Sequence, residues 1–216
     1  VGNCLIGHID THDCMATAWL HSGGVVQMIG YTAVTFYGYM GWGTGLLFED
    51  GRLTLSEAFF LNNQSLLHQL ARRFPHALQA QPGTEDYRSV DAFRQRHAVR
   101  ARDELGLLWD RDAVAFYGDP AWAARYPVED SAADVVLTRQ GERWTLTATV
   151  RRDGVWEDPK WGGRPLAVLL PFRLRDIANV TCVPAGEALV TDRFALLPVA
   201  GRRKAGDHYT LTFTAW

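Results

Sequence analysis

The chain has 216 residues, of which 47% are hydrophobic, and a formal net charge of −2 at pH 7; this is enough for one large or two small domains with a packed core. Acidic and basic residues are interspersed, which excludes the blocks of positive charge typical of nucleic-acid-binding proteins. No stretch approaches the roughly 18 apolar residues of a membrane span, and three cysteines at distant positions exclude a disulfide framework.

The first residues have the highest density of reactive side chains in the chain. Cys4 and Cys14 enclose two histidines, His8 and His12, together with carboxylates. The chain starts without Met and without a signal-peptide pattern. We therefore expect a fragment or a processed chain, with part of its active site contributed by residues before Val1.

Residues 1–29 alternate strand and helix signals. Residues 4–6 form a short apolar strand, residues 15–20 a helix with Thr11 or Asp13 as its N-cap, and residues 25–29 a buried strand. Two strands joined by one helix predict a parallel sheet with a right-handed crossover.

A loop and a long helix follow. Residues 32–45 are too rich in glycine to form a regular element. Thr54 and Glu57 have the spacing of a capping box, which begins an amphipathic helix that ends near Pro75. The first half of the chain is therefore predicted to be an α/β domain.

The chain then forms a second helix and a strand before its composition changes. Residues 91–105 are charged on one face and predict a helix ended by Gly106. Residues 112–120 form an apolar strand interrupted by Gly-Asp-Pro. The polar segment 124–134 contains proline, as linkers between domains commonly do.

Beyond Pro127, short stretches alternate apolar and polar residues and are separated by turn sequences. Six strands are predicted, at residues 135–137, 144–150, 166–170, 180–183, 194–199 and 209–213. Short strands at this spacing, without helices between them, predict a small antiparallel β-sandwich. The domain boundary is therefore placed between residues 1–126 and 127–216.

Two motifs resemble those of the gingipain-type cysteine peptidases, a caspase-like family. The family's nucleophile lies in an Ala-Cys-x-x-Gly context, which is similar to Asn3-Cys4-Leu5-Ile6-Gly7, and a second Cys begins the next helix, as in Cys14-Met-Ala-Thr-Ala-Trp-Leu20. Phe116-Tyr117-Gly118-Asp119-Pro120 resembles the Phe-Gly-Asp-Pro that closes the family's catalytic domain. The resemblance implies the C-terminal part of a caspase-like peptidase domain with a parallel sheet, followed by an immunoglobulin-like β-sandwich.

The resemblance implies that Cys4 is the nucleophile of a cysteine-type endopeptidase with a polypeptide substrate. A thiol at the carboxyl end of a parallel strand lies where α/β sheets place their sites, near helix N–H groups that favour a thiolate. Gly7, with His8 beside it, is the predicted oxyanion-binding position. The family's catalytic His precedes the Cys, so neither His8 nor His12 takes its role. The chain is expected to be catalytically incomplete without the upstream part of its own catalytic domain.

The family resemblance bears on calcium and on location, whereas the residue types bear on zinc. The family resemblance leaves calcium open and implies an extracellular or cell-surface location. Cys4, His8, His12 and Cys14 are residue types that bind zinc, but their spacing matches no common zinc motif. A zinc-binding module is therefore the lesser alternative, and no other cofactor is predicted.

Three aromatic residues after the second strand are candidates for a substrate pocket. Tyr37, Tyr39 and Trp42 are expected at the same sheet edge as Cys4, where they line a pocket or cover the core. Their loop contains no carboxylate, so no preference for Arg or Lys is predicted. The alternative for the whole chain is a non-catalytic binding or surface protein, in which Cys4 is a buried strand cysteine.

Overall fold

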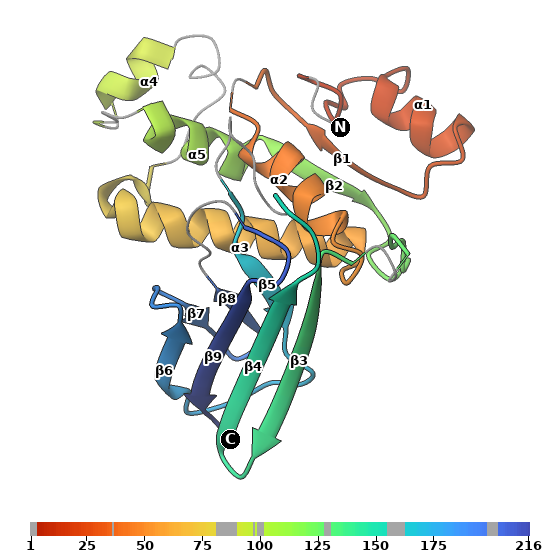
Figure 1. Ribbon diagram of the computed structural model, residues 1–216. Helices are drawn as coiled ribbons and strands as arrows, with labels where there is room; N and C mark the ends of the chain where they lie inside the picture. Colours follow the sequence, from red (N-terminus) through yellow and green to blue (C-terminus); the bar gives the residue numbers. More distant parts are fainter. Residues whose placement is uncertain are drawn as a thin grey trace. The chain divides into compact units, whose positions relative to one another are not determined.

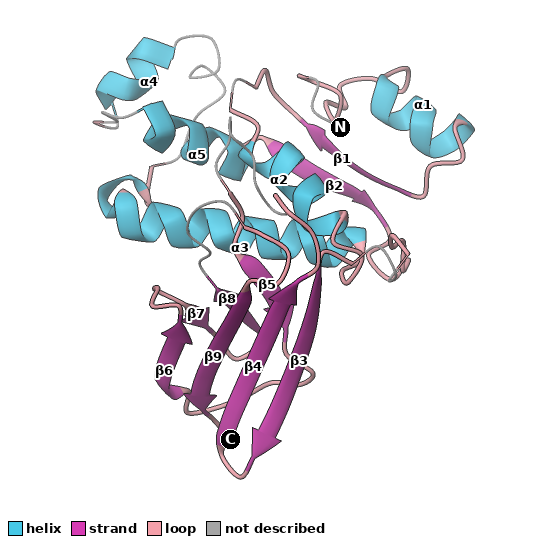
Figure 2. Ribbon diagram, in the orientation of Figure 1, coloured by secondary structure: helices cyan, strands magenta, loops and turns pink. Residues whose placement is uncertain are grey.

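The computed structural model describes residues 4–35, 37–80, 90–96, 98, 102–127, 131–154, 163–197 and 203–216. Helices and antiparallel strands make it a mixed α/β structure (Figure 2). The chain divides into two compact units, Val1–Gly45 with Thr54–Ala124, and Leu46–Leu53 with Arg125–Trp216. The segment Leu46–Leu53 thus belongs to the same unit as the strands that follow residue 125.

Helices and one pair of strands form the first unit (Figure 1). In chain order they are α1 (Met15–Ser22), β1 (Gln27–Tyr31), α2 (Tyr39–Phe48), α3 (Leu55–Arg73), the 3-10 helix η1 (Pro75–Ala77), α4 (Val90–Arg96), α5 (Arg102–Asp112) and β2 (Val114–Gly118). The last residues of α2 belong to the second unit.

The expected parallel sheet is not present among the described residues. Residues 4–7 form a turn instead of a strand. The strand predicted at 25–29 is β1, which begins two residues later at Gln27 and pairs antiparallel with β2, Gln27 opposite Gly118 and Tyr31 opposite Val114. The sequence could not indicate this partner, because β2 lies more than 80 residues further along the chain.

Helix α1 is confirmed, but its N-cap is neither Thr11 nor Asp13. Cys14 occupies the N-cap position with an extended backbone, and its sulfur lies 3.3 Å from Oγ1 of Thr17. Thr17 in turn accepts a hydrogen bond from the N–H of Cys14 over 3.3 Å. Together with the approach of the Thr17 backbone N–H to the Cys14 side chain, this bond gives the arrangement of a capping box, with sulfur in place of the usual hydroxyl oxygen.

The prediction of a loop over residues 32–45 is wrong for its second half, which is helix α2. Its first turn is stabilised by contacts from distant elements. The N–H of Met40 donates to Asp110 over 2.9 Å, and the amide of Asn62 donates to the carbonyls of Tyr39 and Met40. Gly41 is required by packing, since an added Cβ would lie 2.8 Å from the ring of Tyr31. These tertiary contacts outweigh the low helix propensity of glycine.

The long helix α3 is confirmed together with its capping box. The hydroxyl of Thr54 accepts a hydrogen bond from the N–H of Glu57 over 3.2 Å, and the carboxylate of Glu57 accepts one from the N–H of Thr54 over 2.7 Å. The helix ends before Phe74 and Pro75. Its buried residues recur at helical spacing, at Ala58, Leu61, Asn62, Ser65, Leu66 and Leu70.

Helices α3 and α5 contribute half of the residues of the main buried cluster of the first unit. The helix predicted over 91–105 corresponds to α4 and the start of α5, with residues 97 and 99–101 outside the described residues, and Gly106 lies inside α5 rather than at a helix end. The ring of Tyr37 packs directly over Gly106. The buried core residues are Tyr31, Tyr39, Met40, Leu66, Leu70, Ala77, Ala80, Leu105, Leu107, Leu108, Trp109 and Ala113.

The second unit contains two antiparallel sheets. Their strands are β3 (Ala133–Gln140), β4 (Arg143–Val150), β5 (Leu166–Leu169), β6 (Ala178–Val183), β7 (Leu189–Val190), β8 (Phe194–Leu197) and β9 (His208–Thr214). One sheet has the order β3-β4-β9-β6 and the other β5-β8-β7. The six predicted strands are confirmed where the structure describes them, residues 198 and 199 lying outside the described residues, and the sequence missed the two-residue strand β7.

Alternate residues of β4 and β9 are buried, as the period-two pattern predicts. The rings of Trp144 and Phe213 are stacked with centroids 6.3 Å apart, and Leu146 and Leu211 are fully buried beside each other in the register of the two strands. This apolar face supplies the core of the second unit.

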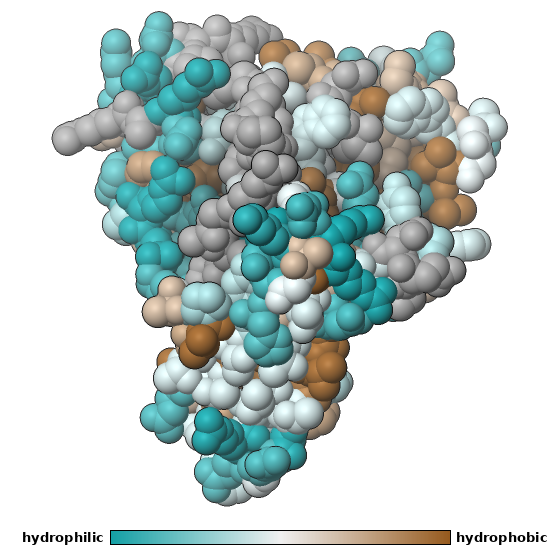
Figure 3. Space-filling model, viewed as in Figure 1, coloured by the Kyte–Doolittle hydropathy of each residue, from teal (hydrophilic) through white to brown (hydrophobic). Residues whose placement is uncertain are grey.

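Among the described residues, no helix combines the length and the hydrophobicity that a membrane crossing requires. On the face shown in Figure 3, hydrophobic side chains form separate brown patches between teal and white ones.

Candidate functional site

Cys4 lies in a tight turn at the start of the described chain. The N–H of His8 donates to the carbonyl of Leu5 over 3.0 Å, and Leu5 has a φ of +60°, which is uncommon for a large side chain. The thiol of Cys4 is exposed. Its sulfur lies 3.3 Å from the carbonyl oxygen of Thr35, to which it donates, and 3.3 Å from the nitrogen of Thr35, whose N–H donates to it. The thiol therefore faces solvent while a backbone N–H points at the sulfur.

A second contact connects this turn to the segment after β1. Nδ1 of His8 lies 2.9 Å from the carbonyl oxygen of Thr32, and Nε2 lies 3.8 Å from a carboxylate oxygen of Asp10. The side chains of His8 and Asp10 are about half exposed or more, at 47% and 64%. His8 thus bonds to the same segment as Cys4, through a different residue.

Gly7 packs against β1, and its amide already has a partner. Its N–H donates to the carbonyl of Tyr31 over 2.9 Å, and its carbonyl accepts a hydrogen bond from the hydroxyl of Tyr117. An added Cβ would lie 2.7 Å from the backbone of Gly30. The N–H of Gly7 is therefore not free to bind a substrate oxyanion in this arrangement, and the close approach of two backbones explains the glycine.

The three aromatic pocket candidates have different environments. Tyr39 is only 1% exposed, and its hydroxyl lies 3.0 Å from Oγ of Ser65, so its side chain is part of the core. Tyr37 is half-buried and stacks on Tyr39, with ring centroids 6.4 Å apart. Trp42 is 51% exposed. Only Trp42 and the outer part of Tyr37 are accessible to a ligand.

Helix α5 fixes the segment that contains Thr35, which the sequence did not reveal. Nε1 of Trp109 donates to the carbonyl of Val34 over 2.8 Å, and Oδ2 of Asp110 accepts hydrogen bonds from Met40 N–H and, over 3.1 Å, from the hydroxyl of Tyr31. Burial raises the pKa of Asp110 from 3.8 to about 6, against the opposing effect of these hydrogen bonds. The pKa of Tyr31 is also raised, mainly by burial and secondly by the nearby Asp110 carboxylate.

Cys14 and His12 lie at the start of α1. The hydroxyl of Thr17 lowers the pKa of the Cys14 thiol through hydrogen bonding, and it donates to the carbonyl of His12 over 2.7 Å. The side chain of His12 is exposed. Cys182, in β6, is half-buried, and burial raises the pKa of its thiol. Cys14 therefore has a structural role as the helix cap.

No group of three or more His, Cys, Asp or Glu side chains within the described residues is arranged to hold a metal ion. Cys4, His8, His12 and Cys14 make the separate contacts given above, with Thr35, Thr32 and Thr17. The zinc alternative gains no support from this geometry.

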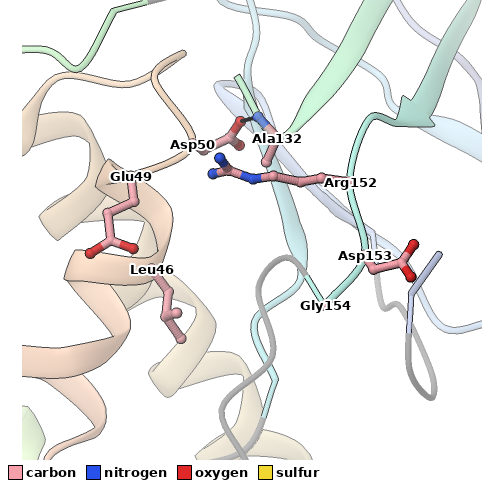
Figure 4. Close-up of a pocket in the computed structure, with 7 residues that line it drawn as sticks. All are labelled: Leu46, Glu49, Asp50, Ala132, Arg152, Asp153 and Gly154. Carbon is pink, nitrogen blue, oxygen red and sulfur yellow. Dashed lines mark hydrogen bonds between the residues drawn. The ribbon is translucent and has the colours of Figure 1, made fainter. Parts of the chain in front are cut away.

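A cavity of about 150 Å³ lies within the second unit (Figure 4). Its lining residues are Leu46, Glu49, Asp50, Ala132, Arg152, Asp153 and Gly154. Asp50 is buried, forms an ion pair with Arg52, and accepts a hydrogen bond from the N–H of Ala132 over 3.3 Å. The guanidinium of Arg152 points toward Asp50 in Figure 4. The lining contains no thiol, hydroxyl or imidazole side chain.

Comparisons of the chain with protein-family models, with curated proteins and with solved structures found no match.

Proposed function

We propose that this chain carries the nucleophile of a cysteine-type endopeptidase, and that Cys4 is that nucleophile. One observation supports this most directly. The thiol is exposed in a turn next to a residue with a left-handed backbone, and the N–H of Thr35 donates to its sulfur. An exposed cysteine can be reached by a peptide carbonyl, and cysteine is a nucleophile once its thiol has lost its proton.

The proposed reaction proceeds through a thioester. The thiol of Cys4 gives its proton to a histidine, the sulfur attacks the carbonyl carbon of a peptide bond, and the carbonyl oxygen becomes an oxyanion. Collapse of this intermediate breaks the carbon–nitrogen bond, and the leaving amine takes the proton from the histidine. Water then attacks the thioester and gives a proton to the same histidine, the carbon–sulfur bond breaks to release the carboxylic acid, and the histidine returns the proton to the sulfur.

This mechanism needs two further groups, a histidine and the donors to the oxyanion, which Cys4 and its neighbours do not supply. Among the described residues, the sulfur of Cys4 is bonded only to the backbone of Thr35, and the N–H of Gly7 is bonded to Tyr31. By resemblance to gingipain-type peptidases, the histidine precedes Cys4 in the natural protein.

The same resemblance extends the proposal to the fold and the environment. We propose a caspase-like peptidase portion followed by an immunoglobulin-like module, supported by the position of Gly118-Asp119-Pro120 at the end of β2, ahead of the antiparallel sheets. A crystal structure of the natural protein in its full length tests this, because a caspase-like portion requires a strand parallel to β1. Calcium dependence and an extracellular or cell-surface location are tested by chelation and by cell fractionation.

The second candidate is a non-catalytic binding protein with the same fold. The occupied N–H of Gly7 favours it, since an endopeptidase requires free donors for the oxyanion.

Alkylation separates the two functions. The natural protein in its full length is treated with iodoacetamide, the labelled cysteines are mapped, and cleavage of a mixed peptide library is measured, with Cys4→Ala as the variant and Cys182→Ala as the matched control. A peptidase gives fast labelling of Cys4 and cleavage that Cys4→Ala abolishes and Cys182→Ala retains. Slow labelling of Cys4, equal to that of Cys182, without cleavage establishes the binding function instead.

A further inference from the structure

Two exposed apolar side chains flank the contact between Cys4 and Thr35. Leu5, which follows Cys4, is 46% exposed, and Val34, which precedes Thr35, is 54% exposed. Consecutive Cα atoms are about 3.8 Å apart, so each side chain begins one residue from the thiol contact. A peptide bound for attack by the sulfur therefore passes close to both.

Val34 has a defined position. Its carbonyl accepts the hydrogen bond from the buried indole of Trp109 over 2.8 Å, and the neighbouring residue Thr35 is bonded to Cys4. The Val34 side chain is thus exposed on a backbone that is fixed on both sides. A side chain on a fixed backbone can contribute to specificity, because little conformational entropy is lost when a substrate binds to it.

The segment after β1 offers no charge to a substrate. Residues 32–42 contain no Asp, Glu, Lys, Arg or His. Asp110, the carboxylate that contacts this segment, is fully buried and bonded to Tyr31 and Met40. Asp10, the carboxylate nearest to Cys4 in the sequence, lies 3.8 Å from Nε2 of His8. A substrate Arg or Lys placed at Val34 would lose hydration without gaining a partner, whereas an apolar side chain would remove apolar surface from water on both sides.

We propose that Leu5 and Val34 form an apolar contact surface beside the Cys4 thiol that selects a large apolar residue, such as Leu or Phe, next to the scissile peptide bond and disfavours Arg and Lys. This inference depends on the proposed peptidase function. It assigns Val34 as the main specificity-determining residue, since it is the more exposed of the two and its backbone is hydrogen-bonded to Trp109.

The test uses the natural protein in its full length and a set of quenched peptides that differ only at the residue before the cleaved bond: Leu, Phe, Ala, Arg, Lys and Asp. We expect kcat/KM for Leu or Phe to exceed that for Ala by about 10- to 200-fold, the range that hydrophobic contacts provide, and Arg and Lys to be cleaved more slowly than Leu. A natural preference for Arg or Lys overturns the inference while leaving the peptidase function intact. Absence of any cleavage, equal to that of Cys4→Ala, overturns both.

Two variants assign the preference to Val34. Val34→Asp should lower kcat/KM for Leu and raise it for Arg, because it places a carboxylate where the cation would lie. Val136→Asp is the matched control, since Val136 in β3 is equally exposed at 54%, and it should leave the profile unchanged. If Val34→Asp folds poorly, Val34→Thr is the substitute test. It keeps the shape of the side chain and removes apolar surface, and it should lower the preference for Leu. An unchanged profile in Val34→Asp and Val34→Thr rules out this role for Val34.

Discussion

Gly7→Ala should destabilise the first unit and displace the Cys4 turn. The added Cβ would lie 2.7 Å from both the carbonyl carbon and the oxygen of Gly30, a backbone contact that no side-chain rotation relieves. Overpacking costs about 1–3 kcal/mol. Moving the turn away from β1 also stretches the bonds of Gly7 to Tyr31 and Tyr117, at about 0.5–1.5 kcal/mol each. We therefore expect a loss of about 2–6 kcal/mol in the free energy of unfolding.

Urea unfolding followed by tryptophan fluorescence measures this loss, and Gly45→Ala is the matched control. Gly45 lies inside α2, an added Cβ there meets nothing within 4 Å, and the change should stabilise the helix by up to about 1 kcal/mol. Alkylation of Cys4 in the two proteins reports whether the turn has moved. If both variants unfold within about 0.5 kcal/mol of each other and Cys4 reacts at the same rate, the close approach of the two backbones is refuted.

Three further changes test other contacts. Asp110→Asn removes a carboxylate whose pKa in the folded protein, about 6, lies above its unfolded value of 3.8. The natural protein therefore loses stability as the pH rises from about 4 to 6, and the variant should gain about 3 kcal/mol in the free energy of unfolding relative to it over that range. A difference between the two proteins that stays constant with pH would contradict the raised pKa. Arg52→Ala leaves the buried Asp50 without its ion-pair partner and should lower the free energy of unfolding in urea by about 3–5 kcal/mol. The control Arg151→Ala breaks an exposed ion pair and should lower it by less than about 1 kcal/mol. Thr54→Ala removes the N-cap of α3 and should cost about 1 kcal/mol by the same assay; no loss would contradict a contribution of the cap to stability.

Features that depend on neighbouring residues were predicted correctly. The capping box at Thr54 and Glu57 involves four consecutive residues, and the strands of the second unit show the alternation of buried and exposed side chains in their own sequence. The sequence also placed the segment that follows β1 near Cys4, but through a parallel sheet that is not present among the described residues; the contact itself is between Cys4 and Thr35.

Features that depend on distant residues were missed. Helix α2 is rich in glycine, and its helical start depends on Asp110 and Asn62, which are 70 and 22 residues from Met40. The antiparallel pairing of β1 with β2 likewise joins segments that no local pattern connects. For the same reason the predicted role of the Gly7 amide could not be judged from the sequence, because its partner is the carbonyl of Tyr31.

The sequence by itself determined the positions of most helices and strands, the antiparallel character of the second half, and Cys4 as the candidate nucleophile. These follow from hydrophobic periodicity, capping and residue chemistry, which act over a few residues. The tertiary structure decided the partner of β1, the helical state of residues 39–48, and the backbone contact between Thr35 and Cys4. Buried hydrogen bonds and packing between distant segments outweigh local propensities of about 1 kcal/mol per residue, and only the folded chain brings those segments together.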